Sequence, residues 1–206
     1  TAIIFLIINH ILIFFAIVIF CYLLAFQEYV KLIKTFSSYN KWFVFGIIYI
    51  LGSMISLIYL RTIDDQILSF FTFLLFSGVM INDSMAFIVG KLLKGPKILP
   101  NISPNKTVSG FFGGLVGSII FFSYCNEYIF PIFTNYQISM VDKYVMIFIC
   151  NVVGFFGDSF ESYLKRKAKI KDSSNILMGH GGMFDRLDSL ILTTPVTLFY
   201  VYAYYL

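Results

Sequence analysis

GDSFESYLKRKAKIKDSSNILMGHGGMFDRLD, residues 157–188, is the polar stretch around which this chain is organised. It separates two apolar segments, and it carries five acids, six cations and a single histidine, His180, set among three glycines. The acids are Asp158, Glu161, Asp172, Asp185 and Asp188, and the cations are Lys165, Arg166, Lys167, Lys169, Lys171 and Arg186. Since nothing in this stretch is needed to cross a bilayer, it requires a chemical explanation.

The composition of the whole chain is that of a membrane protein. Of its 206 residues 59% are hydrophobic and only 13% are charged, and the mean hydropathy is +0.85. Soluble domains carry about 25% charged residues, so the sequence predicts a polytopic membrane protein. Cys21, Cys125 and Cys150 show no CxxC or Cys/His spacing, which favours buried, inert thiols over a disulfide or zinc framework.

The apolar runs predict about six membrane-spanning helices in an all-α fold. A hydrocarbon core about 30 Å thick needs roughly 20 apolar residues of helix, and open strands cannot satisfy their backbone groups there. The segment around Phe130 and Pro131 extends the fourth run or re-enters. The chain begins with Thr rather than Met, so we expect a truncated start. The six runs are 2–26, 42–60, 67–90, 110–125, 141–157 and 187–206.

The cations predict which side of the membrane each loop faces. With six spans, thirteen of the fifteen Lys and Arg residues fall in or beside the first, third and fifth loops, and only Arg61 and Lys143 fall in the others. Cytoplasmic loops carry such an excess of cations, so these three loops are expected on the cytoplasmic side. Attraction to anionic lipid headgroups is an alternative reason for basic loops.

The third loop and the helix before it carry more than charge. The segment begins at Asn82 and reads NDSMAFIVGKLLKGPKILPNISPNKTVSG. Asp83 is costly near the end of an apolar span and indicates a functional group, although a polar contact between helices is the alternative. Lys91 lies about two helical turns further on and can share a face with Asp83.

Glycine and proline pairs after Lys91 exclude a continuous helix, including the pair Ser103-Pro104. Lys106 and Thr107 then stand just before Gly110, where the next span begins. An ammonium, a hydroxyl and free backbone N–H groups at a helix start suit a phosphate. The spacing is not that of a P-loop, so a Walker-type site is not supported.

The fifth loop offers two helix faces. Asp158, Ser162 and Lys165 recur at helical spacing and place a carboxylate, a hydroxyl and an ammonium on one face. An ordinary ion pair between Glu161 and Lys165 is the structural alternative.

Asp185 and Asp188 lie three residues apart at the head of the last span, again on one face. With Asp158 they give three carboxylates, and oxygen ligands without cysteine suit Mg²⁺ or Mn²⁺ better than zinc. Glycines around His180 permit close approach to a ligand, although a lone histidine is also common on surfaces. These residues predict a membrane-surface site for a divalent metal and phosphate, and leave phosphoryl and nucleotidyl transfer open.

Four motifs in this stretch resemble the C-terminal signature of the phosphatidate cytidylyltransferases, the CDP-diacylglycerol synthases. They are SYLKR from Ser162, KDSS from Lys171, GHGGM from Gly179 and DRLD from Asp185. The upstream pattern NDS…GK…SPNKT…G also looks like that family, and the resemblance covers residues 79–206. This chain departs from the family pattern by having Met178 in place of proline, Val108-Ser109 in place of Trp-Glu, and Met85 in place of a small residue.

The resemblance implies transfer of CMP from CTP to phosphatidate, which gives CDP-diacylglycerol and pyrophosphate. Residues 79–206 would then be the catalytic region, with cytoplasmic loops 90–109 and 158–186, and 1–78 the N-terminal spans. Asp158, Asp185 and Asp188 would hold one or two Mg²⁺ or Mn²⁺ ions, beside Ser162, Lys165 and His180. The expected substrate-binding residues are Asp83, Lys91, Ser103, Lys106, Thr107, Arg166, Lys171, Asp172, Gly181, Gly182 and Arg186.

The resemblance also sets the expected partners and location. These are CTP, phosphatidate and other bilayer lipids, no nucleic acid, and a homodimer, in a bacterial inner membrane with the active site facing the cytoplasm. A CTP-dependent lipid kinase of the dolichol-kinase type is the nearest alternative, because it shares the third-loop pattern. A transporter is a second alternative, but transporters place costly polar groups near the bilayer midplane, whereas here they gather at one face.

Overall fold

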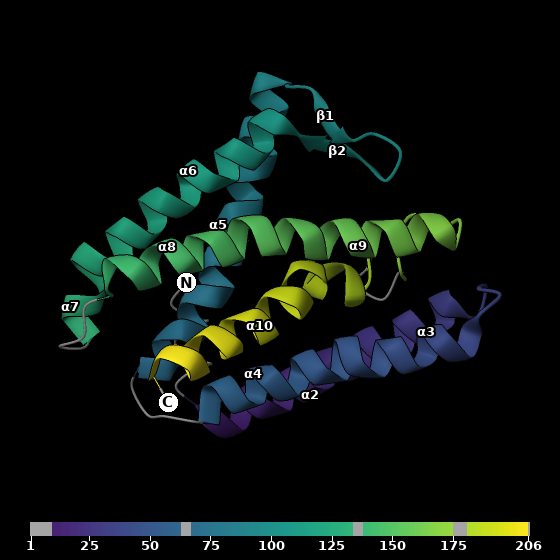
Figure 1. Cartoon of the computed structure of the whole chain (residues 1–206), viewed down its shortest axis with the longest axis horizontal. Helices are drawn as coiled ribbons and strands as arrows, with labels where there is room; N and C mark the ends of the chain where they lie inside the picture. Colours follow the sequence, from purple (N-terminus) through teal and green to yellow (C-terminus); the bar gives the residue numbers. More distant parts are fainter. Residues whose placement is uncertain (1–9, 63–66, 134–137, 175–180, 206) are drawn as a thin grey trace.

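The computed structural model describes residues 10–62, 67–133, 138–174 and 181–205, and within them the fold is almost entirely helical (Figure 1). The predicted all-α membrane class is confirmed, with one small addition, a two-stranded hairpin in the third loop. Three helices contain a π-helical turn, labelled η. The elements in chain order are α2 (Ile11–Ile33), α3 (Tyr39–Gly46), η1 (Ile47–Leu51), α4 (Gly52–Thr62), α5 (Ile67–Leu93), β1 (Lys97–Leu99), β2 (Ser103–Thr107), α6 (Val108–Tyr124), η2 (Cys125–Ile129), α7 (Phe130–Phe133), α8 (Met140–Phe148), η3 (Ile149–Val153), α9 (Gly154–Lys167) and α10 (Phe184–Tyr205).

Five helices in the described ranges are long and apolar enough to cross a membrane. They are Ile11–Ile33, Tyr39–Thr62, Phe70–Leu93, Val108–Ile129 and Met140–Lys167. The sixth expected span is α10, which has the length but is less apolar and contains Pro195. Its threonine hydroxyl groups are satisfied within the helix, because Thr193, Thr194 and Thr197 each donate to a backbone carbonyl one turn earlier.

Two helices extend further into the polar segments than the apolar runs predict. The first described helix runs to Ile33 rather than ending near Phe26, because Tyr29, Leu32 and Ile33 are buried core residues. The fifth span continues to Lys167, so the polar residues from Asp158 onward lie on a helix rather than in a loop. The segment around Phe130 and Pro131 continues the fourth span as α7.

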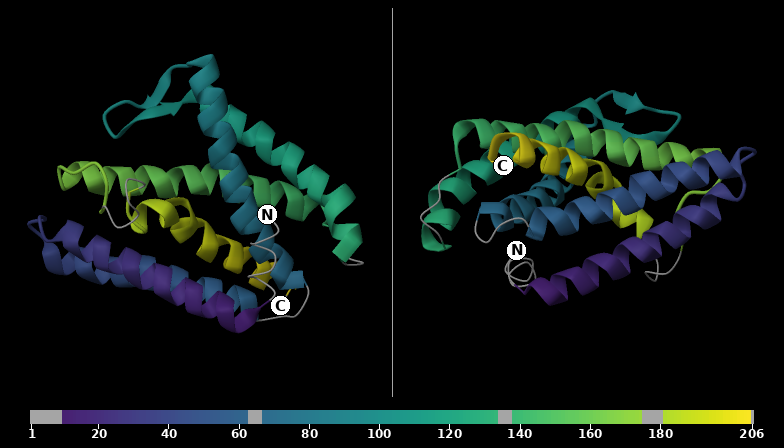
Figure 2. Two further views of the ribbon diagram at one scale, coloured as in Figure 1. Left: turned by 180° about the vertical axis from the view of Figure 1, so that it is seen from behind. Right: turned by 60° about the horizontal axis from the view of Figure 1, so that its bottom comes forward.

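The helices form two groups. α10 lies between the pair α2 and α3–α4 on one side and the long α8–α9 helix on the other (Figure 1). α5 and α6 form an antiparallel pair that leans away from the rest and carries the hairpin at its end (Figure 2). The α2–α3 corner, the hairpin and the end of α9 all lie at one end of the molecule (Figure 1).

Glycines on α6 permit the close packing of α5 against α6. A Cβ at Gly114 would lie 2.6 Å from Asn82 Oδ1, and one at Gly110 would lie 2.7 Å from the Ala86 carbonyl oxygen. Close approach over small residues is a common way to associate helices in a bilayer, where dispersion contacts replace the hydrophobic effect. The α6 glycines therefore allow α5 and α6 to pack closely beside the hairpin.

The hairpin forms where the glycine and proline pairs exclude a helix. β1 pairs antiparallel with β2, with Lys97 opposite Thr107 and Leu99 opposite Ser103. Thr107 ends the second strand and caps α6, since its hydroxyl accepts a hydrogen bond from the Gly110 N–H at 3.1 Å. The hairpin thereby delivers Lys106 and Thr107 to the end of the helix bundle.

Candidate active site

A cavity of about 570 Å³ lies between the hairpin, the α5–α6 pair and the polar ends of α9 and α10. Its size is within the range of about 300–1,000 Å³ typical of ligand pockets. Apolar residues of α5, such as Phe76 and Met80, line it together with polar residues of the hairpin and of the facing ends of α9 and α10. The predicted site residues among its lining are Asp83, Ser103, Lys106, Thr107, Asp158, Asp185, Arg186 and Asp188.

Lys106 joins the third loop to α9. Its Nζ lies 2.9 Å from Asp158 Oδ2 and donates to Ser159 Oγ at 2.8 Å. It also donates to the Phe155 carbonyl oxygen at 3.3 Å and lies over the Phe155 ring. Although 52 residues separate Lys106 from Asp158 in the sequence, the structure thus brings them into direct contact.

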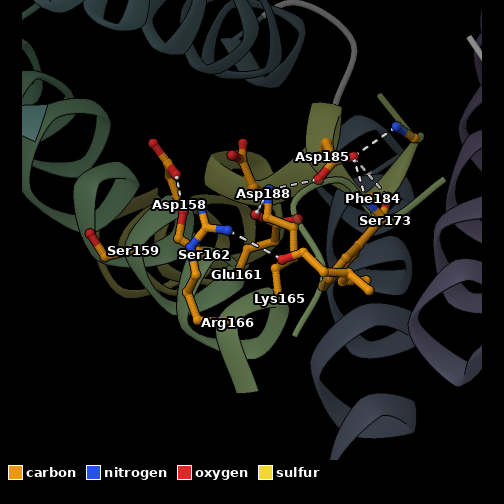
Figure 3. Close-up of polar contacts among 12 residues, drawn as sticks. Asp158, Ser159, Glu161, Ser162, Lys165, Arg166, Ser173, Phe184, Asp185 and Asp188 are labelled. Atoms are coloured by element: carbon orange, nitrogen blue, oxygen red, sulfur yellow. Dashed lines mark hydrogen bonds and ion pairs between the residues drawn. The ribbon is translucent and has the colours of Figure 1, made fainter. Parts of the chain in front are cut away.

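Three carboxylates gather beside this contact. Oxygens of Asp158, Glu161 and Asp188 all lie within 4.8 Å of one another. Figure 3 shows Asp158 on α9 and Asp188 on α10 pointing in the same direction. Such a group of oxygen ligands is able to hold a divalent cation.

Asp185 has a different set of contacts from the other predicted metal ligands. Its Oδ1 lies 2.7 Å from Lys165 Nζ, and its Oδ2 accepts hydrogen bonds from the Gly182 N–H at 2.7 Å and the Ser173 N–H at 3.0 Å (Figure 3). An ammonium and two backbone N–H donors favour the ionised form of this carboxyl over the neutral form. Asp185 is therefore an ionised anchor for Lys165 and for the loop before α10.

Lys165 connects Asp185 to the carboxylate group. Its Nζ is also 2.7 Å from Oε2 of Glu161, the i,i+4 pair that the sequence offered as a structural alternative. Oε1 of the buried Glu161 has no hydrogen-bond partner among the described residues. A buried carboxylate oxygen with an unfilled acceptor position, beside two other carboxylates, fits a metal ligand, because a buried polar atom without a partner is otherwise costly.

The remaining predicted residues lie around the cavity or away from it. Ser162 is buried and donates to Asp158 Oδ1 at 3.4 Å. Arg166 donates to the carbonyl oxygens of Ile102 and Ile170, and so ties the hairpin to α9. Lys91 lies on α5 near the Phe87 ring, outside the cavity lining.

The fifth-loop residues are only partly described. Lys171 and Asp172 are exposed and outside the cavity lining, and His180 lies outside the described residues. Gly181 has a φ of +79°, in the left-handed region that favours glycine. A Cβ on Gly182 would collide with Ser173 Oγ and Glu28 Oε2.

Sequence reasoning did not single out Glu28 or Asn151, and it assigned Glu161 only to an ion pair. Glu28 accepts four hydrogen bonds from the segment around α10. Asn151 on η3 donates to Asn82 Oδ1 at 2.8 Å beneath the cavity. Polar side chains inside apolar segments were the available signal, because such groups are costly in a bilayer unless they have partners.

These features define an integral membrane protein with a pocket of carboxylates, Lys106 and Arg186 at one end of its helices. The sequence profile of the Cytidylyltransferase family matches residues 1–204, and the chain belongs to this family. The divalent metal suggested by the family has a matching group of acidic residues here.

Individual relatives agree with this membership. The chain is 40% identical over 130 residues to a phosphatidate cytidylyltransferase of Bacillus subtilis, covering 62% of this chain and 46% of the relative. It is 30% identical over 171 residues to the phosphatidate cytidylyltransferase of Aquifex aeolicus, covering 81% of this chain and 62% of the relative. It is 42% identical over 120 residues to the phosphatidate cytidylyltransferase of Rickettsia felis, covering 57% of this chain and 52% of the relative. The chain thus spans about half the length of the curated relatives it matches.

Proposed function

We propose that this chain transfers CMP from CTP to phosphatidate in the membrane, giving CDP-diacylglycerol and pyrophosphate. The observation that carries the proposal is the cavity itself, which combines Lys106, Asp158 and Asp188 with apolar residues of α5. A nucleotide triphosphate needs cations and metal ligands, and a lipid substrate needs an apolar wall. The names of the relatives support the same reaction.

The chemistry is an in-line displacement at the α-phosphorus of CTP. A bond forms from a phosphatidate oxygen to that phosphorus, the bond to the bridging oxygen breaks, and pyrophosphate leaves with the electron pair. Because the nucleophile is already an anion, little general base is needed, and positioning supplies most of the acceleration. We assign charge stabilisation of the phosphates to Lys106 and Arg186, which line the cavity.

A divalent metal, when bound, would neutralise phosphate charge as pyrophosphate leaves. We assign Asp158, Glu161 and Asp188 as its ligands, and Mg²⁺ or Mn²⁺ as its identity, since the donors are all carboxylate oxygens. Both oxygens of Asp185 are occupied by Lys165 and by backbone N–H groups. We therefore assign Asp185 to holding Lys165 rather than to the metal.

The location follows from the loops. The α2–α3 corner, the hairpin and the end of α9 carry most of the cations and lie at one end, together with the cavity. By the positive-inside rule this end would face the cytoplasm of a bacterial inner membrane, where CTP is available. A homodimer stays an expectation from the family resemblance.

Labelled CTP tests the reaction and separates it from a lipid kinase. Purified protein in detergent–phosphatidate micelles with Mg²⁺ is given CTP labelled at either the α- or the γ-phosphate. Label from the α-position should enter the lipid, and label from the γ-position should be released as pyrophosphate. Lipid labelled only from the γ-position would overturn the proposal in favour of a CTP-dependent kinase.

A further inference from the structure

Glu28 on α2 is a fully buried carboxylate for which the proposed reaction gives no role. It lies in a membrane-length helix, where an ionised group is costly unless it is well partnered. Its partners in the described part of the chain are four hydrogen-bond donors, all from residues 173–184, which lie 145–156 positions away in the sequence. A contact of this kind between distant segments indicates a specific role.

Each oxygen of Glu28 accepts one side-chain and one backbone hydrogen bond. Oε1 accepts from Ser174 Oγ at 2.6 Å and from the Met183 N–H at 3.1 Å. Oε2 accepts from Ser173 Oγ at 2.9 Å and from the Phe184 N–H at 2.8 Å. Glu28 therefore binds both the residues that follow α9 and the residues that begin α10.

The two backbone bonds make Glu28 the N-terminal cap of α10. The first N–H groups of a helix have no partner within the helix, and a carboxylate there is also favoured by the helix dipole. In this protein the cap comes from another helix rather than from the preceding residues. The neighbouring Tyr29 packs its ring against Phe184 with a centroid distance of 5.7 Å, so α2 fixes the start of α10 by both polar and apolar contacts.

Glu28 is connected to the carboxylate group through three intermediate residues, Ser173, Asp185 and Lys165. Ser173 Oγ lies 2.9 Å from both Glu28 Oε2 and Asp185 Oδ2, and its single hydrogen is donated to one of them at a time. Asp185 in turn holds Lys165, whose Nζ contacts Glu161. The start of α10 also carries Asp188, which lies about one helical turn after Phe184.

We propose that Glu28 is a positioning residue that holds Ser173 and Ser174 against the start of α10, and thereby aligns Asp188, Asp185 and Lys165 with the carboxylates of α9. This inference rests on the proposed metal-dependent function of the same site. Outer-shell partners of metal ligands contribute about 10–100-fold to metal affinity or activity when they are mutated, and we expect an effect in that range.

The main test compares Glu28→Gln with the wild-type protein by Mn²⁺ binding and by hydrogen exchange. The amide keeps the size of the side chain but directs an NH₂ group at N–H and O–H donors. We expect the half-saturating Mn²⁺ concentration to rise about 10–100-fold, and backbone exchange in peptides covering 181–188 to become at least about tenfold faster. For CMP transfer, kcat should fall while the KM for CTP stays the same.

Asp142→Asn is the matched control. Asp142 is also a buried carboxylate, and it accepts hydrogen bonds from Tyr200 and Tyr205 at the opposite end of α10, about 30 Å from its start at 1.5 Å per residue. This variant should lose stability without changing Mn²⁺ binding or exchange at 181–188. Equal changes of Mn²⁺ binding and of exchange at 181–188 in the two variants would overturn the positioning role. It would also be overturned if Glu28→Gln bound Mn²⁺ and exchanged its backbone hydrogens as the wild-type protein does.

Ser174→Ala keeps the test decisive if Glu28→Gln does not fold. It removes one donor to Glu28 and leaves the carboxylate in place, so a smaller, roughly threefold to tenfold rise in the half-saturating Mn²⁺ concentration is expected. No change in Mn²⁺ binding or exchange would contradict the proposal. If the wild-type protein binds Mn²⁺ but transfers no CMP, the proposed function is overturned. The role of Glu28 would still be decided by Mn²⁺ binding and by hydrogen exchange at 181–188.

Discussion

Lys106 and Asp158 form the contact on which the cavity depends at the scale of single residues. The ammonium of Lys106 lies 2.9 Å from the Asp158 carboxylate and is only partly exposed, so it is fixed where the α9 and α10 carboxylates converge. A cation held in this place can meet the phosphates of CTP without reorganising, which is the condition under which a charge stabilises a transition state most effectively.

Replacing Lys106 by methionine should therefore reduce kcat for CMP transfer by about 10²–10³-fold. The side chain keeps most of its apolar length, so insertion and folding should be retained. Lys97→Met is the matched control, because Lys97 is an exposed lysine on the other strand of the same hairpin. Equal losses in both variants, measured with α-labelled CTP, would contradict a specific role for Lys106.

Asp188→Asn should abolish metal-dependent turnover while the protein still inserts and folds. Asp188 belongs to the group of three carboxylates, and an amide supplies neither the charge nor the second oxygen ligand. Mn²⁺ titration and CMP transfer measure the two consequences. Glu127→Gln, at an exposed carboxylate on η2, should leave both unchanged, and near-normal activity of Asp188→Asn would refute the metal assignment.

At the scale of elements, the α5–α6 contact sets one wall of the cavity. Asn82 on α5 contacts both η3 and α6, because its Oδ1 accepts a hydrogen bond from Asn151 Nδ2 at 2.8 Å and lies 3.5 Å from the donor Ser118 Oγ. Gly114 leaves the space for this network, since a Cβ there would lie 2.6 Å from Asn82 Oδ1 and 3.2 Å from Asn151 Nδ2. The glycine thus supports both helix packing and the floor of the site.

Gly114→Ala should lower the free energy of unfolding by about 1–3 kcal/mol, the usual effect of overpacking a close contact. Thermal unfolding in detergent measures the change. Gly52→Ala is the control, because a Cβ at Gly52 meets nothing within 4 Å, and alanine should there raise stability by up to about 1 kcal/mol. An unchanged melting temperature for Gly114→Ala would contradict this prediction, because it would mean that α5 and α6 can move apart at little cost to make room for the methyl group.

The whole molecule is polarised along the helix axes. One end carries the basic loops (Figure 1) and the cavity. The opposite end of α10 is held by Asp142, which accepts hydrogen bonds from Tyr200 at 2.6 Å and Tyr205 at 2.7 Å. Separation of this kind places charged substrates at one membrane surface and leaves the apolar faces of the helices to lipid.

Labelling by a membrane-impermeant thiol reagent should report this polarity. In a variant whose three native cysteines are replaced by alanine, a single cysteine at the exposed Asn101 or Lys169 should react in inside-out vesicles and not in intact cells. Glu127→Cys should show the reverse. Reaction of Asn101→Cys and Glu127→Cys from the same side would contradict the orientation.

Local sequence patterns were enough to predict the membrane class, the approximate number of spans, the shared side of the basic loops, and the charged residues that line the cavity. Composition and apolar run length carry the first three, because bilayer thickness and charge asymmetry act on local segments. Local spacing also indicated Asp158 and Asp188, since residues about one turn apart share a helix face.

Which carboxylates share a site depends on long-range packing and became visible only in the three-dimensional structure. This packing grouped Glu161 with Asp158 and Asp188, turned Asp185 toward Lys165, and brought Glu28 from the first described helix to the start of α10. The contacts of Glu28 join residues at least 145 positions apart, and no periodic pattern encodes such a distance. They depend on how the helices pack, which is set by the sum of many side-chain contacts along their lengths.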